Sequence, residues 1–221
     1  AYNLTERLMR YQDFCEMEYC VAESTLIAQP DGYKTIGELA RECELEPDKT
    51  FIVYSYDHEK RCIVPAVGKQ ARQTRTDDAW RVKFDNGQEI VGTADHRLML
   101  RDGTFCKIGE LKPGMAMMPF HRRDLYAGKE DAITGYRWVY TMAPGSHNGW
   151  EAEHRVIAEW IADRHIADDE VVHHINFKKD DNRPENLVIM TRSDHSAYHA
   201  TLNNEKKWSN VEWVEQFKAR H

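Results

Sequence analysis

The chain has 221 residues, of which 41% are hydrophobic and 30% are charged, so one or two domains with packed cores are expected. No run approaches about 18 consecutive apolar residues, so a membrane-spanning helix and a membrane partner are not expected. The net charge is −7, with −4 on residues 1–119 and −3 on residues 120–221, which excludes a strongly basic nucleic-acid-binding module. Any contact with DNA must therefore come from local basic patches.

The five cysteines contain no Cys-x-x-Cys pair, which argues against structural zinc and against a disulfide framework. They are Cys15, Cys20, Cys43, Cys62 and Cys106. This usage fits a reducing, intracellular compartment, and we expect a cytoplasmic protein. No signal peptide is visible, although the chain begins with Ala1 rather than Met, which suggests that its natural start is missing.

Residues 3–19 show helical spacing, with Leu4, Leu8 and Tyr11 on one face, and Thr5 or Asn3 is a candidate N-cap. From Cys20 onward the pattern changes to short strands and turns. Strands are predicted over 21–28, 51–56, 62–67, 80–84, 89–92, 97–100 and 104–108, with a short helix over 35–43. The Asn-Gly pair at 86–87 is a strong hairpin signal. Closely spaced strands with Gly, Pro and Asp turns indicate an all-β module over 20–119.

Three motifs in this module suggest a family. They are Cys-Val-Ala-Glu-Ser-Thr-Leu-Ile from residue 20, Gly-Thr-Ala-Asp-His over 92–96, and Gly-Glu-Leu-Lys-Pro-Gly over 109–114. Together and in this order they resemble the Hint domain, the fold of inteins and hedgehog autoprocessing domains, across residues 20–119. The resemblance implies self-cleavage chemistry at the start of the module and makes residues 1–19 the tail of a host protein, an N-extein.

The implied chemistry begins at Cys20, whose thiol attacks the carbonyl of Tyr19 to give a thioester. A planar amide resists this acyl shift. By the resemblance, Thr93 hydrogen-bonds and strains the peptide, and His96 protonates its nitrogen. Inteins end in a block that closes with His-Asn, which the chain end, Phe-Lys-Ala-Arg-His over 217–221, does not contain. A C-terminal intein half, in cis or in trans, is therefore the expected partner. Taken alone, Cys20 is better explained as an ordinary buried residue, and Thr93 and His96 as ordinary residues at a strand end.

Residues 120–134 are charged and irregular and are predicted to be a linker. A strand over 136–142 follows, and then a helix over 150–164. The next stretch, 171–199, reads VVHHINFKKDDNRPENLVIMTRSDHSAYH. It predicts a β-hairpin followed by a helix, with His, Asn and His side chains meeting in one pocket. Cutting a phosphodiester needs a general base, for which neutral imidazole is suited, and a Lewis acid such as Mg²⁺ or Mn²⁺.

This stretch closely resembles the HNH endonuclease family over residues 135–203. The resemblance implies a ββα-metal fold that cuts double-stranded DNA with one divalent metal ion, Mg²⁺ or Mn²⁺. It makes His174 the general base, Asn186 the residue that orients it, and His173 and His195 metal ligands. His173 stands where many members have Asp. His199 has no role in the family pattern and could be a further ligand, bind phosphate or be idle.

Four basic residues are candidates for DNA contacts: Arg155, Lys178, Lys179 and Arg183. The neighbouring acidic residues Asp180 and Asp181 make a solvated turn an equally good interpretation. Residues 204–221 have helical spacing and could pack on the nuclease or lie against DNA.

The fold class expected is an all-β Hint-type module followed by an α+β ββα-metal (HNH) nuclease domain. The main interpretation is a fragment of a mobile intein with its homing endonuclease. One alternative is a stand-alone nicking endonuclease whose Hint-like domain only docks DNA. Another is a degenerate, non-enzymatic element.

Overall fold

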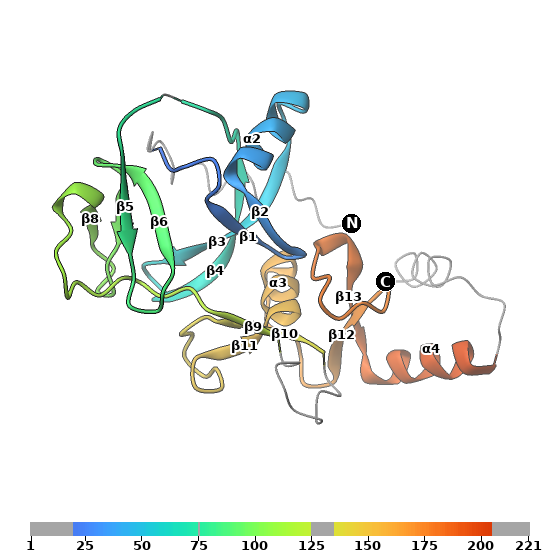
Figure 1. The fold of residues 1–221 in the computed structure, drawn as a ribbon. Helices are drawn as coiled ribbons and strands as arrows, with labels where there is room; N and C mark the ends of the chain where they lie inside the picture. The colour runs from blue at the N-terminus through green and yellow to red at the C-terminus, as the bar shows by residue number, and fades with distance from the viewer. Residues whose placement is uncertain (1–19, 75, 125–134, 205–221) are drawn as a thin grey trace. The chain divides into compact units, whose positions relative to one another are not determined.

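A computed structural model describes residues 20–74, 76–124 and 135–204 (Figure 1). The helices predicted over 3–19 and within 204–221, and most of the predicted linker, lie outside these residues. The described chain forms two compact units, one from 20–60 and 66–120 and the other from 61–65 and the residues after 120. None of its helices is long and apolar enough to cross a membrane.

The first unit is built from short strands in two-stranded sheets, together with one α-helix and one turn of 3₁₀-helix. The strands are β1 (Leu26–Gln29), β2 (Gly32–Thr35), β3 (Thr50–Asp57), β4 (Cys62–Lys69), β5 (Ala79–Lys83), β6 (Glu89–Thr93), β7 (Arg97–Met99) and β8 (Phe105–Lys107), and the helices are α2 (Ile36–Leu45) and η1 (Ile108–Glu110). The sheets pair β1 with β2, β3 with β4, β5 with β6, and β7 with β8. The first residues of β4 group with the second unit, where Ile63 donates its N–H to the carbonyl of Thr141 at 2.8 Å.

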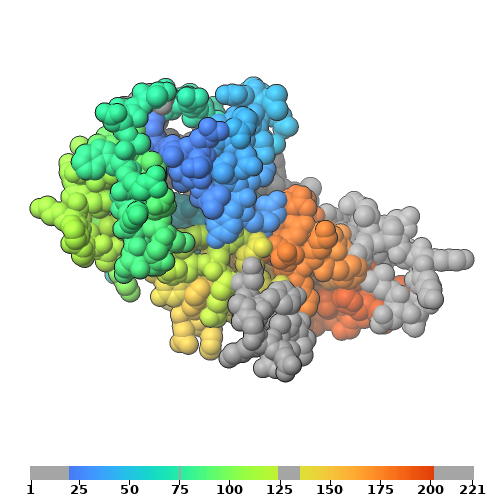
Figure 2. Space-filling view, viewed as in Figure 1, coloured from blue at the N-terminus to red at the C-terminus, as the bar shows by residue number. Residues whose placement is uncertain are grey.

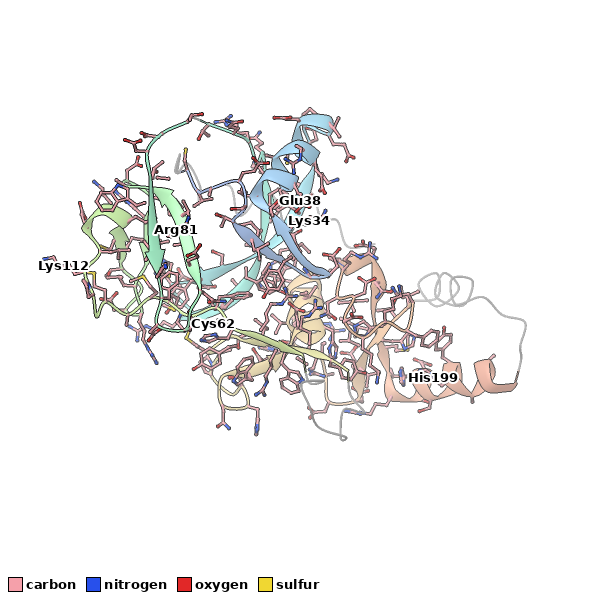
Figure 3. The ribbon with its side chains drawn as sticks, viewed as in Figure 1. Lys34, Glu38, Cys62, Arg81, Lys112 and His199 are labelled. Atoms are coloured by element: carbon pink, nitrogen blue, oxygen red, sulfur yellow. The ribbon has the colours of Figure 1, made fainter. Side chains whose placement is uncertain are left out.

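Local turn chemistry explains these elements. Gly87 has a φ of 81°, a conformation that favours glycine, and it closes the turn between β5 and β6. The helix α2 begins at a capping box, in which Thr35 accepts from the N–H of Glu38 and Glu38 accepts from the N–H of Thr35. Its inner face buries Leu39 and Cys43. Figure 3 labels Lys34 in β2 and Glu38 in the first turn of α2, and α2 with β1 and β2 forms one continuous blue surface in Figure 2.

The predicted strand over 21–28 is shorter in the structure, and β1 begins only at Leu26. Residues 20–22 instead run along β6: Val21 bridges Gly92, and Ala22 donates to the carbonyl of Val91 at 2.8 Å. The chain turns between these two segments, where Thr25 donates to the carbonyl of Ala22 at 2.9 Å. The start of the module is therefore fixed against β6 by backbone hydrogen bonds.

The second unit contains a three-stranded sheet in the order β11-β10-β9, a β-hairpin and two α-helices. Its elements are β9 (Arg122–Asp124), β10 (Arg137–Tyr140), β11 (Trp150–Ala152), α3 (Glu153–Ala162), β12 (Glu170–His174), η2 (Pro184–Asn186), β13 (Leu187–Thr191) and α4 (Arg192–Asn204). Strands β12 and β13 are antiparallel, and His173 pairs with Val188. Ala158 of α3 packs with Ile166 and Val172 in the core of this unit.

The helix predicted over 150–164 was wrong at its start. Residues 150–152 form β11, because they pair with β10 in the register Tyr140↔Trp150, and the helix begins at Glu153. The hairpin and helix predicted over 171–199 are present as β12, β13 and α4. The described residues thus contain three α-helices and small antiparallel sheets, a mixed architecture in which one hairpin-then-helix segment carries the histidines.

Candidate active site and metal centre

Three histidines converge where β12 meets α4. His173 is a buried residue of β12, and His195 and His199 lie one turn apart on α4, where Figure 3 labels His199. One ligand nitrogen from each lies within 4.8 Å of the other two. Thr191 fixes the start of α4 by accepting from the N–H of Asp194 at 3.1 Å and donating to its carboxylate at 2.8 Å. The helix is thereby held directly after β13, the partner strand of β12.

The chemistry of this cluster fits a divalent metal ion. Nε2 of His173 is buried and has no hydrogen-bond partner among the described residues. Burial, and then the neighbouring charges of His195 and His199, lower the pKa of His173 to about 4. Burial also lowers the pKa of His195. Neutral imidazoles carry the lone pairs that a metal needs, so these side chains could hold one ion at neutral pH.

His174 follows on the same strand and faces a different set of groups. Its Nε2 lies 2.9 Å from Oδ1 of Asn182, and its ring lies against the rings of Tyr136 and His154, at 5.8 and 5.3 Å between centroids. Burial lowers the pKa of His174, while the hydrogen bond with Asn182 and the charge of Asp181 oppose this shift. The imidazole is therefore neutral near pH 7 and able to accept a proton.

The ring of His174 is bonded by Asn182, whereas Asn186, predicted to orient this base, lies in the loop between the two strands of the hairpin. Asn186 ties the hairpin loop together: its Oδ1 accepts from the N–H of Asn176 at 2.9 Å, and its Nδ2 donates to the carbonyl of Asp181 at 2.7 Å. Any orienting effect of Asn186 on His174 must therefore pass through the loop.

Sequence reasoning gave no role to Asn182 or Glu153. Both are fully buried, and Nδ2 of Asn182 donates to Oε2 of Glu153 at 2.7 Å. Glu153 in turn pairs with Arg122 at 2.8 Å. The one available signal was Glu153 itself, a charged residue at the start of an otherwise apolar helix face, since buried carboxylates are rare without a partner.

The four basic candidates differ in what their charges contact. Both oxygens of Asp181 accept from Arg183 at 2.8 Å, and this contact, the largest cause, lowers the pKa of Asp181 to about 2. Nζ of Lys179 lies 4.9 Å from the centre of the Tyr136 ring. Arg155 lies 3.8 Å from Glu159 on the same helix. Lys178 is exposed. Arg183 is thus largely committed to the loop, and Lys178 and Lys179 stay candidates for phosphate contacts.

The candidate residues of the first unit also lie together. The N–H of Thr93 donates to the carbonyl of Cys20 at 3.0 Å, its hydroxyl reaches the same carbonyl at 3.4 Å, and the N–H of His96 donates to the carbonyl of Thr93 at 3.0 Å. A Cβ on Gly92 would stand 3.2 Å from the carbonyl oxygen of Cys20, so glycine at this position lets the two backbone segments approach closely. Burial lowers the pKa of His96. The Thr93 hydroxyl, predicted to bond the Tyr19–Cys20 peptide, here bonds the carbonyl of Cys20 itself, and Tyr19 lies outside the described residues.

Residues 151–197 match the family model of HNH endonucleases. The chain therefore contains an HNH endonuclease domain. This family implies a nuclease that is generally metal-dependent, and the matched segment includes His173, His174, Asn186 and His195, while His199 lies just beyond it. The chain is also 31% identical over 187 residues to the B subunit of DNA gyrase from Synechocystis sp. (strain ATCC 27184 / PCC 6803 / Kazusa), a match that covers 81% of this chain. The chain spans 17% of the length of that relative.

Proposed function

We propose that the HNH domain hydrolyses phosphodiester bonds of double-stranded DNA with one divalent metal ion. The observation that carries the proposal is the cluster of His173, His195 and His199 beside a fourth, neutral histidine, His174, on one hairpin-then-helix segment. Two separate tasks are thus assigned to neighbouring side chains. Three imidazoles could hold the metal, and a fourth is left to move a proton.

His174 takes the proton from the attacking water, since its imidazole is neutral near pH 7 and it is held in place by Asn182. A bound metal ion would supply Lewis-acid chemistry at the phosphate and the leaving 3′ oxygen. His173 and His195 would hold this ion, and we add His199 as a third ligand, because its nitrogen belongs to the same group. Asn186 holds the loop between the two strands.

The donor atoms bear on which metal is used. Mg²⁺ prefers oxygen ligands, whereas the first-row transition-metal ions, of which Mn²⁺ is the weakest binder, also accept imidazole nitrogen. A site with three imidazoles should therefore work better with Mn²⁺ than with Mg²⁺. Lys178 and Lys179 contact the DNA backbone, with Arg155 and Arg183 as further candidates. Because these few residues neutralise only a few phosphates, non-specific binding to DNA should be weak.

We further propose that the chain is part of a mobile intein. Residues 20–119 would be its Hint domain with an acyl shift at Cys20, residues 1–19 an N-extein tail, 120–134 a linker, 135–203 the homing endonuclease and 204–221 a helical segment. Support comes from the backbone hydrogen bond between Thr93 and Cys20, and from the one between His96 and Thr93. A match confined to 17% of a gyrase polypeptide is also what an element inserted in a host gene would give. A C-terminal splicing segment, in cis or in trans, is the required partner.

Plasmid cleavage tests the nuclease. With Mn²⁺, the wild-type chain should convert supercoiled DNA to nicked or linear forms, and His174→Ala should lower the rate by on the order of 10²–10⁴, the usual effect of losing a general base. His165→Ala is the matched control, because the His165 side chain is 98% exposed. Equal activity in His174→Ala and wild type would overturn the assignment of the base, and an inert wild-type chain would overturn the nuclease itself.

A further inference from the structure

A hydrogen-bonded relay of polar side chains runs from Arg122 through Glu153 and Asn182 to His174. Nη2 of Arg122 lies 2.8 Å from Oε1 of Glu153, Nδ2 of Asn182 donates to Oε2 of Glu153 at 2.7 Å, and Oδ1 of Asn182 lies 2.9 Å from Nε2 of His174. Arg137 adds a second guanidinium 3.8 Å from the same carboxylate. Glu153 and Asn182 are both fully buried. Burial of a carboxylate is costly without countercharges, and the two guanidiniums offset this cost for Glu153.

The hydrogen-bond donors and acceptors of this relay can be arranged in one way only. The carboxylate of Glu153 accepts hydrogen bonds and, facing two guanidiniums, donates none. The amide group of Asn182 must therefore turn its Nδ2 toward Glu153, which leaves Oδ1 toward His174. An amide oxygen only accepts, so Nε2 of His174 must carry the proton. The lone pair of the neutral ring is then on Nδ1.

We propose that Asn182, oriented by Glu153, is a positioning residue that fixes His174 in the Nε2–H tautomer and makes Nδ1 the nitrogen that accepts the proton of water. This inference rests on the proposed function, in which His174 is the base. Asn182 acts only through His174. The choice of tautomer sets which nitrogen is available for catalysis, since the hydrogen bond at one ring nitrogen decides the state of the other.

The packing around the His174 ring limits its other orientations. Tyr136 and His154 pack together on one side of His174, with ring centroids 5.8 and 5.3 Å from its ring and 4.5 Å from each other. His174 is 4% exposed. A ring flip would place the Cε1–H group opposite the Asn182 oxygen and lose the hydrogen bond. The other tautomer would present the lone pair of Nε2 to the lone pairs of that oxygen. The closely packed surroundings and the relay therefore favour the same orientation.

The tautomer can be read directly by two-bond ¹H–¹⁵N correlation of the full ¹⁵N-labelled chain without metal or DNA. We expect Nε2 of His174 to be protonated and Nδ1 to be unprotonated at pH 7.5. The opposite tautomer, or an equal mixture, would overturn the inference. This measurement needs no cleavage, so it is distinguishable from failure of the nuclease: a chain with the Nε2–H tautomer that cuts no DNA would refute the proposed function and leave the relay standing.

Variants then connect the tautomer to catalysis. Asn182→Leu removes both hydrogen bonds at similar volume and should lower kcat by about 10–100-fold, the usual effect of removing a supporting hydrogen bond, with KM for DNA unchanged. Asn182→Asp alone would place two carboxylates in contact. Combined with Glu153→Gln it restores the donor order, because Gln donates to Asp and Asp accepts from Nε2–H. Recovery of the tautomer and of kcat in this double variant supports the relay, and an unchanged kcat in a folded Asn182→Leu variant contradicts it.

Discussion

His154 should make the second unit sensitive to mild acid. It is 7% exposed at the start of α3, and its ring lies 4.5 Å from that of Tyr136 and 5.3 Å from that of His174. Burial, then the charges of His174 and Arg155, lower its pKa from 6.5 to about 3. In the folded chain this imidazole stays neutral over a pH range in which the unfolded chain binds a proton.

The direction of the change in unfolding free energy with pH follows from the difference in proton binding between the folded and unfolded states. The folded pKa of His154 is lower than the unfolded value, so the unfolded state binds more protons as the pH falls from about 6.5 toward 3. Stability is fully present above pH 6.5 and declines below it. At pH 5 the unfolded side chain is almost fully protonated and the folded one is not. One such group then lowers the free energy of unfolding by about 2 kcal/mol relative to pH 7.5.

Urea unfolding at pH 7.5 and pH 5, followed by tryptophan fluorescence in EDTA, measures this difference. His154→Phe should show a drop in unfolding free energy that is smaller than that of wild type by about 2 kcal/mol, whatever its absolute stability. His173, whose pKa is about 4, titrates in both proteins and so cancels. His165→Phe, which alters an exposed histidine, should behave as wild type. An identical pH dependence in wild type and His154→Phe would refute the reasoning.

Three further outcomes follow from the same geometry. Calorimetric titration with Mn²⁺ should show one site that disappears in a variant with both His173→Ala and His195→Ala, and binding that survives would place the metal elsewhere. Non-specific DNA binding should weaken only gently with salt, by about −0.9 in log–log slope per neutralised phosphate, and a slope steeper than about −8 would reveal an unrecognised basic surface. With a matching C-terminal splicing segment, dithiothreitol should release residues 1–19, and Cys20→Ala should abolish this release, because no acyl shift can occur. Release that continues in Cys20→Ala would remove the basis for a Hint reaction.

The elements that the sequence predicted well are those set by local signals. Asn86 and Gly87 specify a tight turn, and the strands on either side of it pair as expected. The spacing of His195 and His199 places them on one face of a helix, and the hairpin before it brings His173 beside them. Local spacing and chain direction were sufficient for these positions.

The relay could not be found in this way, because its parts are distant in the sequence. Glu153 and Asn182 are 29 positions apart and meet only when α3 packs against the hairpin loop. The start of α3 was misplaced for a similar reason, since Trp150 is drawn into a sheet by pairing with Tyr140 on another strand. Helical periodicity does not report such partners, and both errors arise from contacts between elements.

The most direct test of the account is single-turnover cleavage of duplex DNA in H₂¹⁸O with Mn²⁺. If His174 activates water, one ¹⁸O atom should enter the new 5′-phosphate and the other end should be a 3′-hydroxyl. The rate should fall by on the order of 10²–10⁴ in His174→Ala. A product phosphate without ¹⁸O, or a 3′-phosphate end, would contradict a metal-assisted attack by water at this site.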